Sequence, residues 1–330
     1  MRDVSPGAAS HPRLASLTSH EVGGARRLNA LLRLLPSYKT DRRWNAKTVQ
    51  AAIRIAQLLV PDGLGRHRDV VTRTVLADGK RIRLRLIRPN GARRGLYVHF
   101  HGGAWVMGNA RLDDGITRPI VKDCQVVVAG VDFHNADDDR LDLALLDSKA
   151  SLEWLADHLA EFEVEHLVLG GESSGAQLAA EALLHLRQRR KAEAVVGFVS
   201  VCGAFDLGGS QSLRLSTGRS LVIDGQSALR NLQRLTPSLS GREAKGPLSA
   251  DLSGLPPALL VAGALDPILD DSILMYERWQ SQNGNADCVV FPEAPHGFNR
   301  FPTKLAARAN SLVRAWISQT LDRTASAGRG

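Results

Sequence analysis

HLVLGGESSGAQLAAEALLHL, residues 166–186, reads as a buried strand, a tight turn and a helix in direct succession. The apolar run ends at Gly170, the turn is GESSG (171–175), and helical spacing of leucine and alanine begins near Ser174. In a G-x-S-x-G turn the glycines let the strand and helix pass closely, and the central Ser173 is strained and exposed. The stretch predicts a reactive serine at the top of a sheet, although the turn alone fits a helix-capping serine equally well.

Short apolar runs recur on both sides of this stretch and alternate with amphipathic segments. After a hairpin over 70–89 that turns at Asp78-Gly79, we expect strands at 96–100, 126–133, 166–170, 196–201, 258–263 and 288–291. We expect helices at 110–123, 143–160, 174–191, 268–283 and 303–322, and an earlier one within 44–63. This alternation predicts an α/β domain with a mostly parallel, eight-stranded sheet and helices on both faces.

Composition and charge exclude several classes of protein. The chain has 330 residues, of which 44% are hydrophobic and 23% charged, as in ordinary globular domains. The formal charge is +8, but basic residues are dispersed, and the densest cluster, RQRRK (187–191), suits a helix end. No apolar run approaches the roughly 18 residues of a membrane span. We therefore expect a cytoplasmic protein without a nucleic-acid or membrane partner. Cys124, Cys202 and Cys288 are odd in number and widely spaced, so we expect them to be free thiols.

A serine hydroxyl needs a histidine base, itself oriented by a carboxylate, and both have candidates near the carboxyl ends of later strands. His296 lies in the loop FPEAPHGFNR (291–300), after the last expected strand. Asp266 lies in LLVAGALDPILDDS (259–272), after the preceding strand, where Asp270 and Asp271 are weaker candidates. The order Ser173, Asp266, His296 is typical of α/β-hydrolases.

Acyl transfer also needs hydrogen-bond donors for the oxyanion, and HFHGGAWVMGN (99–109) provides glycines directly after a strand. Backbone N–H groups of Gly102, Gly103 and Ala104 are predicted to converge with the N–H of Ser174, while His101 ties the loop down. The alternatives are a tight turn or a phosphate cradle. The glycine spacing matches neither dinucleotide nor P-loop motifs.

Together, HGGAW, GESSG, DPILDD and PHGF resemble the hormone-sensitive lipase-like branch of the α/β-hydrolases, which includes many bacterial carboxylesterases. The resemblance covers roughly residues 65–322. It implies an oxyanion hole at Gly102, Gly103, Ala104 and Ser174, and a helical cap from residues 25–63 and 203–250. We expect 1–24 to be a loosely attached tail, 25–322 the hydrolase domain and 323–330 a flexible end.

Three positions depart from the family pattern. Where members carry a Tyr-Arg-Leu-Ala-Pro-Glu-like stretch that braces the oxyanion loop, this chain has VDFHNADDD (131–139). Glu172 replaces the more usual aspartate, and Ala104 replaces a third glycine. The loss of the family's stretch bears on the geometry of the loop rather than on the catalytic triad, and the changes at Glu172 and Ala104 keep the backbone groups.

The sequence predicts a serine carboxylesterase for short- to medium-chain esters, with Ser173 as nucleophile and no metal or organic cofactor. Trp105, Phe205 and Leu207 are the expected pocket residues. The alternatives are an amidase or aryl-formamide hydrolase with the same triad and a non-catalytic small-molecule receptor, which usually lacks a triad member. A homodimer is one open alternative for the oligomeric state.

Overall fold

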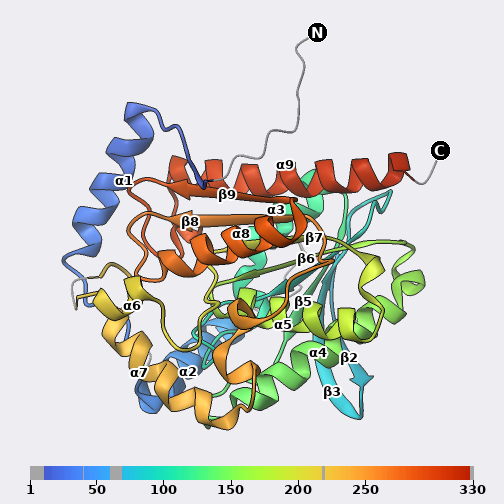
Figure 1. Cartoon of the computed structure of the whole chain (residues 1–330), viewed down its shortest axis with the longest axis horizontal. Coiled ribbons are helices and arrows are strands. Elements are labelled where there is room, and N and C mark those ends of the chain that lie inside the picture. Colours follow the sequence, from blue (N-terminus) through green and yellow to red (C-terminus); the bar gives the residue numbers. More distant parts are fainter. Residues whose placement is uncertain (1–10, 40, 60–68, 218–219, 328–330) are drawn as a thin grey trace.

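A nine-stranded, mostly parallel sheet forms the centre of the protein in the computed structural model, which describes residues 11–39, 41–59, 69–217 and 220–327. Figure 1 shows the sheet among its helices. Its spatial order is β1-β9-β8-β7-β6-β4-β5-β3-β2. β2 and β3 pair antiparallel and β3 pairs antiparallel with β5, whereas the other pairs are parallel. The strands are β1 (Arg13–Leu14), β2 (Val70–Ala77), β3 (Lys80–Ile87), β4 (Leu96–Phe100), β5 (Val127–Asp132), β6 (Leu167–Glu172), β7 (Val195–Val201), β8 (Ala258–Gly263) and β9 (Ala286–Phe291).

The ninth strand, β1, is the one the sequence did not predict. It has two residues and pairs in parallel with β9, Arg13 opposite Val289 and Leu14 opposite Val290. A strand this short has no period of its own. Thr18 then caps α1 (Ser19–Leu32) through a capping box with Glu21. Residues 11–24 therefore carry defined structure where a loose tail was expected, and residues 1–10 lie outside the described part.

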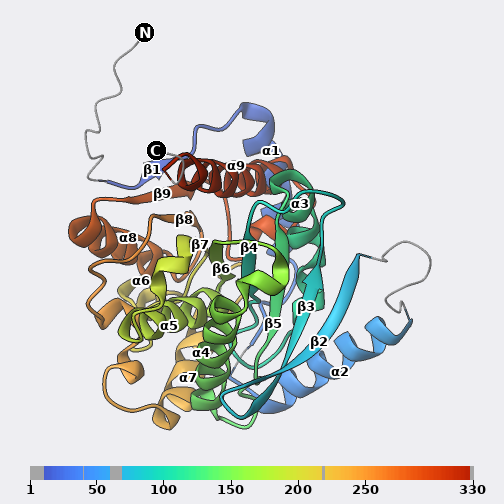
Figure 2. The ribbon, with the colours of Figure 1, turned by 90° about the vertical axis from the view of Figure 1, so that its right-hand side faces the viewer.

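Helices cover both faces of the sheet, as predicted. α4 (Leu141–Asp157), α5 (Ser174–Gln188) and α8 (Leu269–Asn283) share one hydrophobic core with the sheet. α1, α3 (Asp114–Cys124) and α9 (Lys304–Ala327) share another core on the opposite face. Figure 2 shows α3 and α9 above the strands and α4, α5 and α8 below them. Because both faces are packed, strands such as β6 are buried along their whole length.

Three further helices gather near the carboxyl edge of the parallel strands. They are α2 (Arg43–Leu59), α6 (Gln211–Leu215) and α7 (Gly225–Leu235), seen in the lower part of Figure 1. A bridge between Tyr38 and Ile223 joins the segment before α2 to the segment before α7. α2 matches the helix expected within 44–63, although residues 60–63 lie outside the described part, and α7 lies within the segment 203–250.

The C-terminal helix is longer than expected. α9 continues to Ala327, beyond the predicted helix end at residue 322 and into the segment 323–330 that was expected to be flexible. Residues 328–330 are outside the described part. None of the described helices is both long and apolar enough to cross a membrane.

Candidate active site

Ser173 lies at the sharp turn between β6 and α5. Its φ of +54° falls in the left-handed region that L-residues rarely adopt. The two glycines of GESSG are required by space: a Cβ on Gly171 would lie 2.5 Å from the carbonyl carbon of Gly175, and a Cβ on Gly175 would lie 2.1 Å from the carbonyl oxygen of Phe100. The turn can therefore form only with glycine at both positions, and it projects the Ser173 hydroxyl above the strand ends.

The three side chains predicted from the sequence lie in one hydrogen-bonded line. The Ser173 hydroxyl is 2.9 Å from Nε2 of His296, and Nδ1 of His296 is 2.9 Å from Oδ2 of Asp266. Because a carboxylate only accepts, Nδ1–H donates to Asp266 and Nε2 is left to accept from the serine. Asp266 is fixed in turn by the N–H of Ile268, 3.0 Å from Oδ1. Asp270 and Asp271 do not contact His296; each accepts hydrogen bonds from backbone N–H groups of the 203–250 segment.

Electrostatics favour the protonated form of His296. Burial alone lowers its pKa, but the charge of Asp266 and the hydrogen bond to it outweigh burial, and Glu172 adds to them. The pKa of His296 is therefore raised above its ordinary value, although Arg300 acts in the opposite direction. An imidazole of raised pKa accepts a proton from serine more readily. As the pH falls, it is protonated and lost as a base at a higher pH than an ordinary histidine.

The loop after β4 lies against the serine turn. A Cβ on Gly102 would be 3.4 Å from Cβ of Ser173, and a Cβ on Gly103 would be 2.0 Å from the carbonyl oxygen of Met107, so Gly103 cannot be replaced without moving the loop. Ala104 also has a positive φ, +52°. Within the part of the chain that the structure describes, the N–H groups of Gly103, Ala104 and Ser174 donate to no backbone or side-chain acceptor. They remain available to an oxygen anion.

His101 holds this loop, as expected from the sequence. Its Nδ1–H donates to the carbonyl of Gly102 at 2.8 Å, and its ring stacks on Phe133 with centroids 4.2 Å apart. Burial lowers the pKa of His101, so the ring is neutral at neutral pH.

The unusual stretch 131–139 braces the same loop by its own contacts. Ala136 N–H donates to the carbonyl of Trp105 at 2.8 Å, and the Asn135 amide donates to the carbonyl of Gly108 at 3.1 Å. Gln50 of α2 adds two hydrogen bonds to the backbone of Gly108. Although the stretch departs from the family pattern, these hydrogen bonds support the loop after β4.

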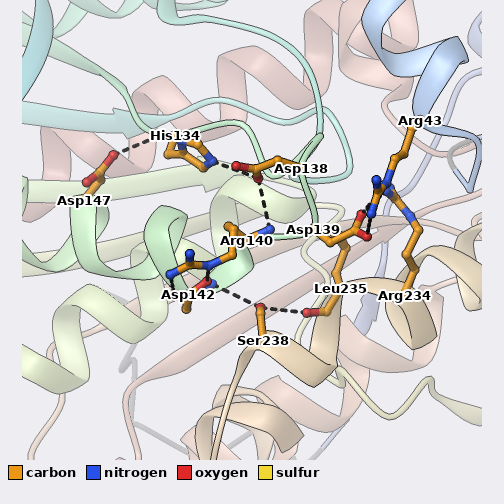
Figure 3. Close-up of polar contacts among 10 residues, drawn as sticks. All are labelled: Arg43, His134, Asp138, Asp139, Arg140, Asp142, Asp147, Arg234, Leu235 and Ser238. Atoms are coloured by element: carbon orange, nitrogen blue, oxygen red, sulfur yellow. Dashed lines mark hydrogen bonds and ion pairs between the residues drawn. The ribbon is translucent and has the colours of Figure 1, made fainter.

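Asp139, the last residue of this stretch, also connects α2 and α7, as Figure 3 shows. The Asp139 carboxylate pairs with Arg43 of α2 and with Arg234 of α7. Arg234 donates to Oδ1 of Asn231 at 2.8 Å, and Asn231 donates to the carbonyl of Ala104 at 3.1 Å. A continuous polar chain thus runs from α2 to the loop beside Ser173.

Sequence reasoning missed a second polar network on the other side of the serine. Arg300 pairs with Glu172, next to Ser173, and with Asp113, which His99 contacts at 2.6 Å. Burial raises the pKa of Asp113, but Arg300 and His99 hold it below its usual range. The one signal in the sequence was Glu172, whose side chain is longer than the aspartate usual at this position. No motif marks its partner Arg300, which lies 128 positions away.

A cavity of about 360 Å³ opens beside Ser173 and His296. Its walls are mostly apolar and come from the strand ends and the outer helices, including Tyr38, Ile53, Leu213, Ile223 and Leu232. Trp105 lines it, as expected from the sequence. Phe205 and Leu207 do not; both are buried in the core, and their neighbours Ala204 and Asp206 reach the cavity instead.

One group of side chains in the described part has ligand atoms close enough for a metal ion. Atoms of Cys202, Asp266 and His296 lie within 4.8 Å of one another. However, Asp266 and His296 already bond to each other, and burial raises the pKa of the Cys202 thiol, which disfavours the thiolate that a metal needs. The proton-relay geometry accounts for the group.

Known proteins resemble the chain over most of its length. An acetyl esterase of Salmonella typhi is 24% identical over 291 residues, 83% of this chain and 82% of that protein. Among solved structures, an esterase of Pyrobaculum calidifontis is 26% identical, with a TM-score of 0.77 over 89% of this chain and 97% of that one. A bacterial heroin esterase is 23% identical with a TM-score of 0.77, covering 90% of this chain and 97% of its own, and supports the fold alone.

A family model described as the alpha/beta hydrolase fold matches residues 97–300, from β4 through the histidine loop. The match contains the glycine loop, the serine turn and the aspartate and histidine loops described above. The chain belongs to the alpha/beta hydrolase fold family.

Proposed function

We propose that this protein is a serine carboxylesterase that hydrolyses short- to medium-chain carboxylic esters through an acyl-enzyme on Ser173. The observation that carries the proposal is the line from Ser173 through His296 to Asp266, with both hydrogen bonds at 2.9 Å. The esterase names of the relatives and of the 26% identical structure support the same chemistry.

In the proposed first half-reaction, Ser173 Oγ attacks the acyl carbon while Nε2 of His296 takes its proton. The N–H groups of Gly102, Gly103, Ala104 and Ser174 are the proposed donors to the tetrahedral oxygen. Asp266 holds the histidine tautomer and stabilises the imidazolium. His296 then protonates the departing alcohol, leaving the acyl group on Ser173.

In the second half-reaction, water takes the place of the alcohol. His296 deprotonates the water, which attacks the acyl carbon, and the C–O bond to Ser173 breaks as the serine regains its proton. Carboxylic acid leaves and the enzyme is restored. These steps need no metal or organic cofactor.

The size and lining of the cavity support the preference for short acyl chains. About 360 Å³ of mostly apolar space is enough to hold the acyl group of a small ester. Cleavage of p-nitrophenyl esters of graded length measures this directly. Faster turnover of long-chain esters than of butyrate would contradict the preference, and anilide turnover matching ester turnover would favour the amidase alternative.

The nucleophile is tested by Ser173→Ala, expected to lower kcat by about four orders of magnitude or more and to abolish labelling by a fluorophosphonate probe. The matched control is Ser174→Ala, because the neighbouring serine contributes only a backbone N–H to the proposed mechanism and should keep the label. Retention of label in Ser173→Ala, or its loss in Ser174→Ala alone, would refute the assignment.

A further inference from the structure

The outer face of α2 carries an exposed apolar stripe. Trp44, Ile55, Leu58 and Leu59 are 61%, 59%, 77% and 77% exposed. Trp44, Ala51, Ile55 and Leu58 recur at spacings of seven, four and three, which place them on one side of a helix. The large apolar side chains stand at the two ends of this side of α2, with Thr48 and Ala51 between Trp44 and Ile55.

Contacts on the opposite side determine which face of α2 points outward. Ala46 is fully buried and Ile53 lines the cavity. Gln50 bonds to Gly108, and Gln57 exchanges two hydrogen bonds with the side chain of Asn109 at 2.9 and 3.0 Å. α2 lies at the rim of the molecule in Figure 2. Because these contacts hold the opposite side of α2 against the domain, the stripe faces outward.

The charged side chains of α2 itself are all positive, whereas Asp132 and Asp137 border a surface hollow beside Arg54 and Leu58. α2 contains no aspartate or glutamate, and Lys47 and Arg54 lie two turns apart along one edge of the stripe. Both are exposed and form no ion pair within the described part of the chain. Arg42 directly precedes the helix and is exposed too. A helix with tryptophan and leucine on one side and unpaired cations beside them has the features of a helix lying in a lipid interface.

We propose that the outer face of α2 docks onto an anionic lipid surface, with the apolar stripe inserted at the headgroup boundary and Lys47 and Arg54 among the lipid phosphates. A second copy of this chain fits less well, because a symmetric contact between two α2 stripes brings the same unpaired cations together. The proposal concerns binding at the surface. It goes beyond the sequence-based expectation of no membrane partner, which rested on the lack of a spanning segment.

Docking has a consequence that rests on the proposed esterase function. Ile53 of the same helix lines the cavity, so α2 would separate the lipid surface from the substrate site by the width of one helix. Apolar esters that concentrate in a bilayer would then be presented close to the cavity. Binding itself does not depend on catalysis.

The direct test is co-sedimentation of the full chain with vesicles at low salt. Wild type and Ser173→Ala are expected to bind vesicles of phosphatidylcholine plus phosphatidylserine and to bind phosphatidylcholine alone at least about tenfold more weakly. Trp44 is the exposed one of five tryptophans, so its emission should shift to the blue on binding. Trp44→Phe should remove the shift. Equal binding to both vesicle types would overturn the anionic-surface proposal.

Paired variants separate the stripe from the overall positive charge. Ile55→Asp with Leu58→Asp, and separately Lys47→Gln with Arg54→Gln, should each weaken binding by about tenfold or more. Leu76→Asp on β2 is the matched control, since Leu76 is 68% exposed, and should bind as wild type. Unchanged hydrolysis of a soluble butyrate ester verifies folding of the variants. Binding that survives the stripe variants, or a dimer in sedimentation velocity that only those variants abolish, would overturn the proposal.

Discussion

At the scale of single residues, the proposed chemistry depends on how neighbouring charges set the proton affinity of His296. Asp266 and Glu172 favour its charged form, and Arg300 opposes them. Arg300 is itself held between Glu172 and Asp113. Glu172, which precedes the nucleophile in the serine turn, therefore also raises the pKa of His296.

The first prediction follows from the sign of these effects. The base must be neutral, so kcat/KM should fall as the pH drops through the raised pKa of His296, with a midpoint above the ordinary value of about 6.5. Glu172→Gln removes a negative charge but keeps an oxygen acceptor for Arg300, and should move the midpoint to lower pH. The pH profile with an activated short ester measures both. A midpoint that stays in place or rises in Glu172→Gln would contradict the assignment.

At the scale of elements, the loop beside Ser173 is held by parts of the chain that are far apart in sequence. The 131–139 stretch, α2 and α7 all donate hydrogen bonds to its carbonyls. Asp139 joins the two helices through Arg43 and Arg234. The position of the loop thus depends on how the outer helices pack.

Asp139→Asn tests this dependence. Without the shared anion, Arg43 and Arg234 repel each other and Asn231 loses its fixed orientation toward the carbonyl of Ala104, so kcat should fall about tenfold. Asp142→Asn is the matched control, because the Asp142 carboxylate pairs with Arg140, two residues away, and with no residue of the loop beside Ser173. Steady-state kinetics with a short ester distinguish the variants; equal losses in both would show that Asp139 has no special link to the site.

At the scale of the whole molecule, one sheet separates two hydrophobic cores that should unfold together. Leu183 of α5 and Ile317 of α9 are both fully buried, on opposite faces. Alanine at either site should lower the free energy of unfolding by about 2–5 kcal/mol, and the two losses should add. Urea unfolding followed by circular dichroism tests this. Two separate transitions would mean that the faces unfold independently.

Much of the architecture could be predicted because its signals are local. Buried parallel strands appear as short apolar runs, amphipathic helices lie between them, and the glycines of the serine turn are required by contacts within a few residues. The β1 strand could not be found this way, since two residues have no period. The prediction that Phe205 and Leu207 line the pocket was wrong, because which side of a loop faces a cavity depends on distant packing.

The sequence by itself determined the α/β order, the serine turn and the three residues of the proton line, because each is encoded by short motifs and by the order of strand ends along one sheet edge. Only the tertiary structure decided the Arg300 network, the Asp139 junction and the outward direction of the α2 stripe. Each of these joins or orients side chains from segments remote in sequence, and their contacts depend on packing geometry that no local pattern records.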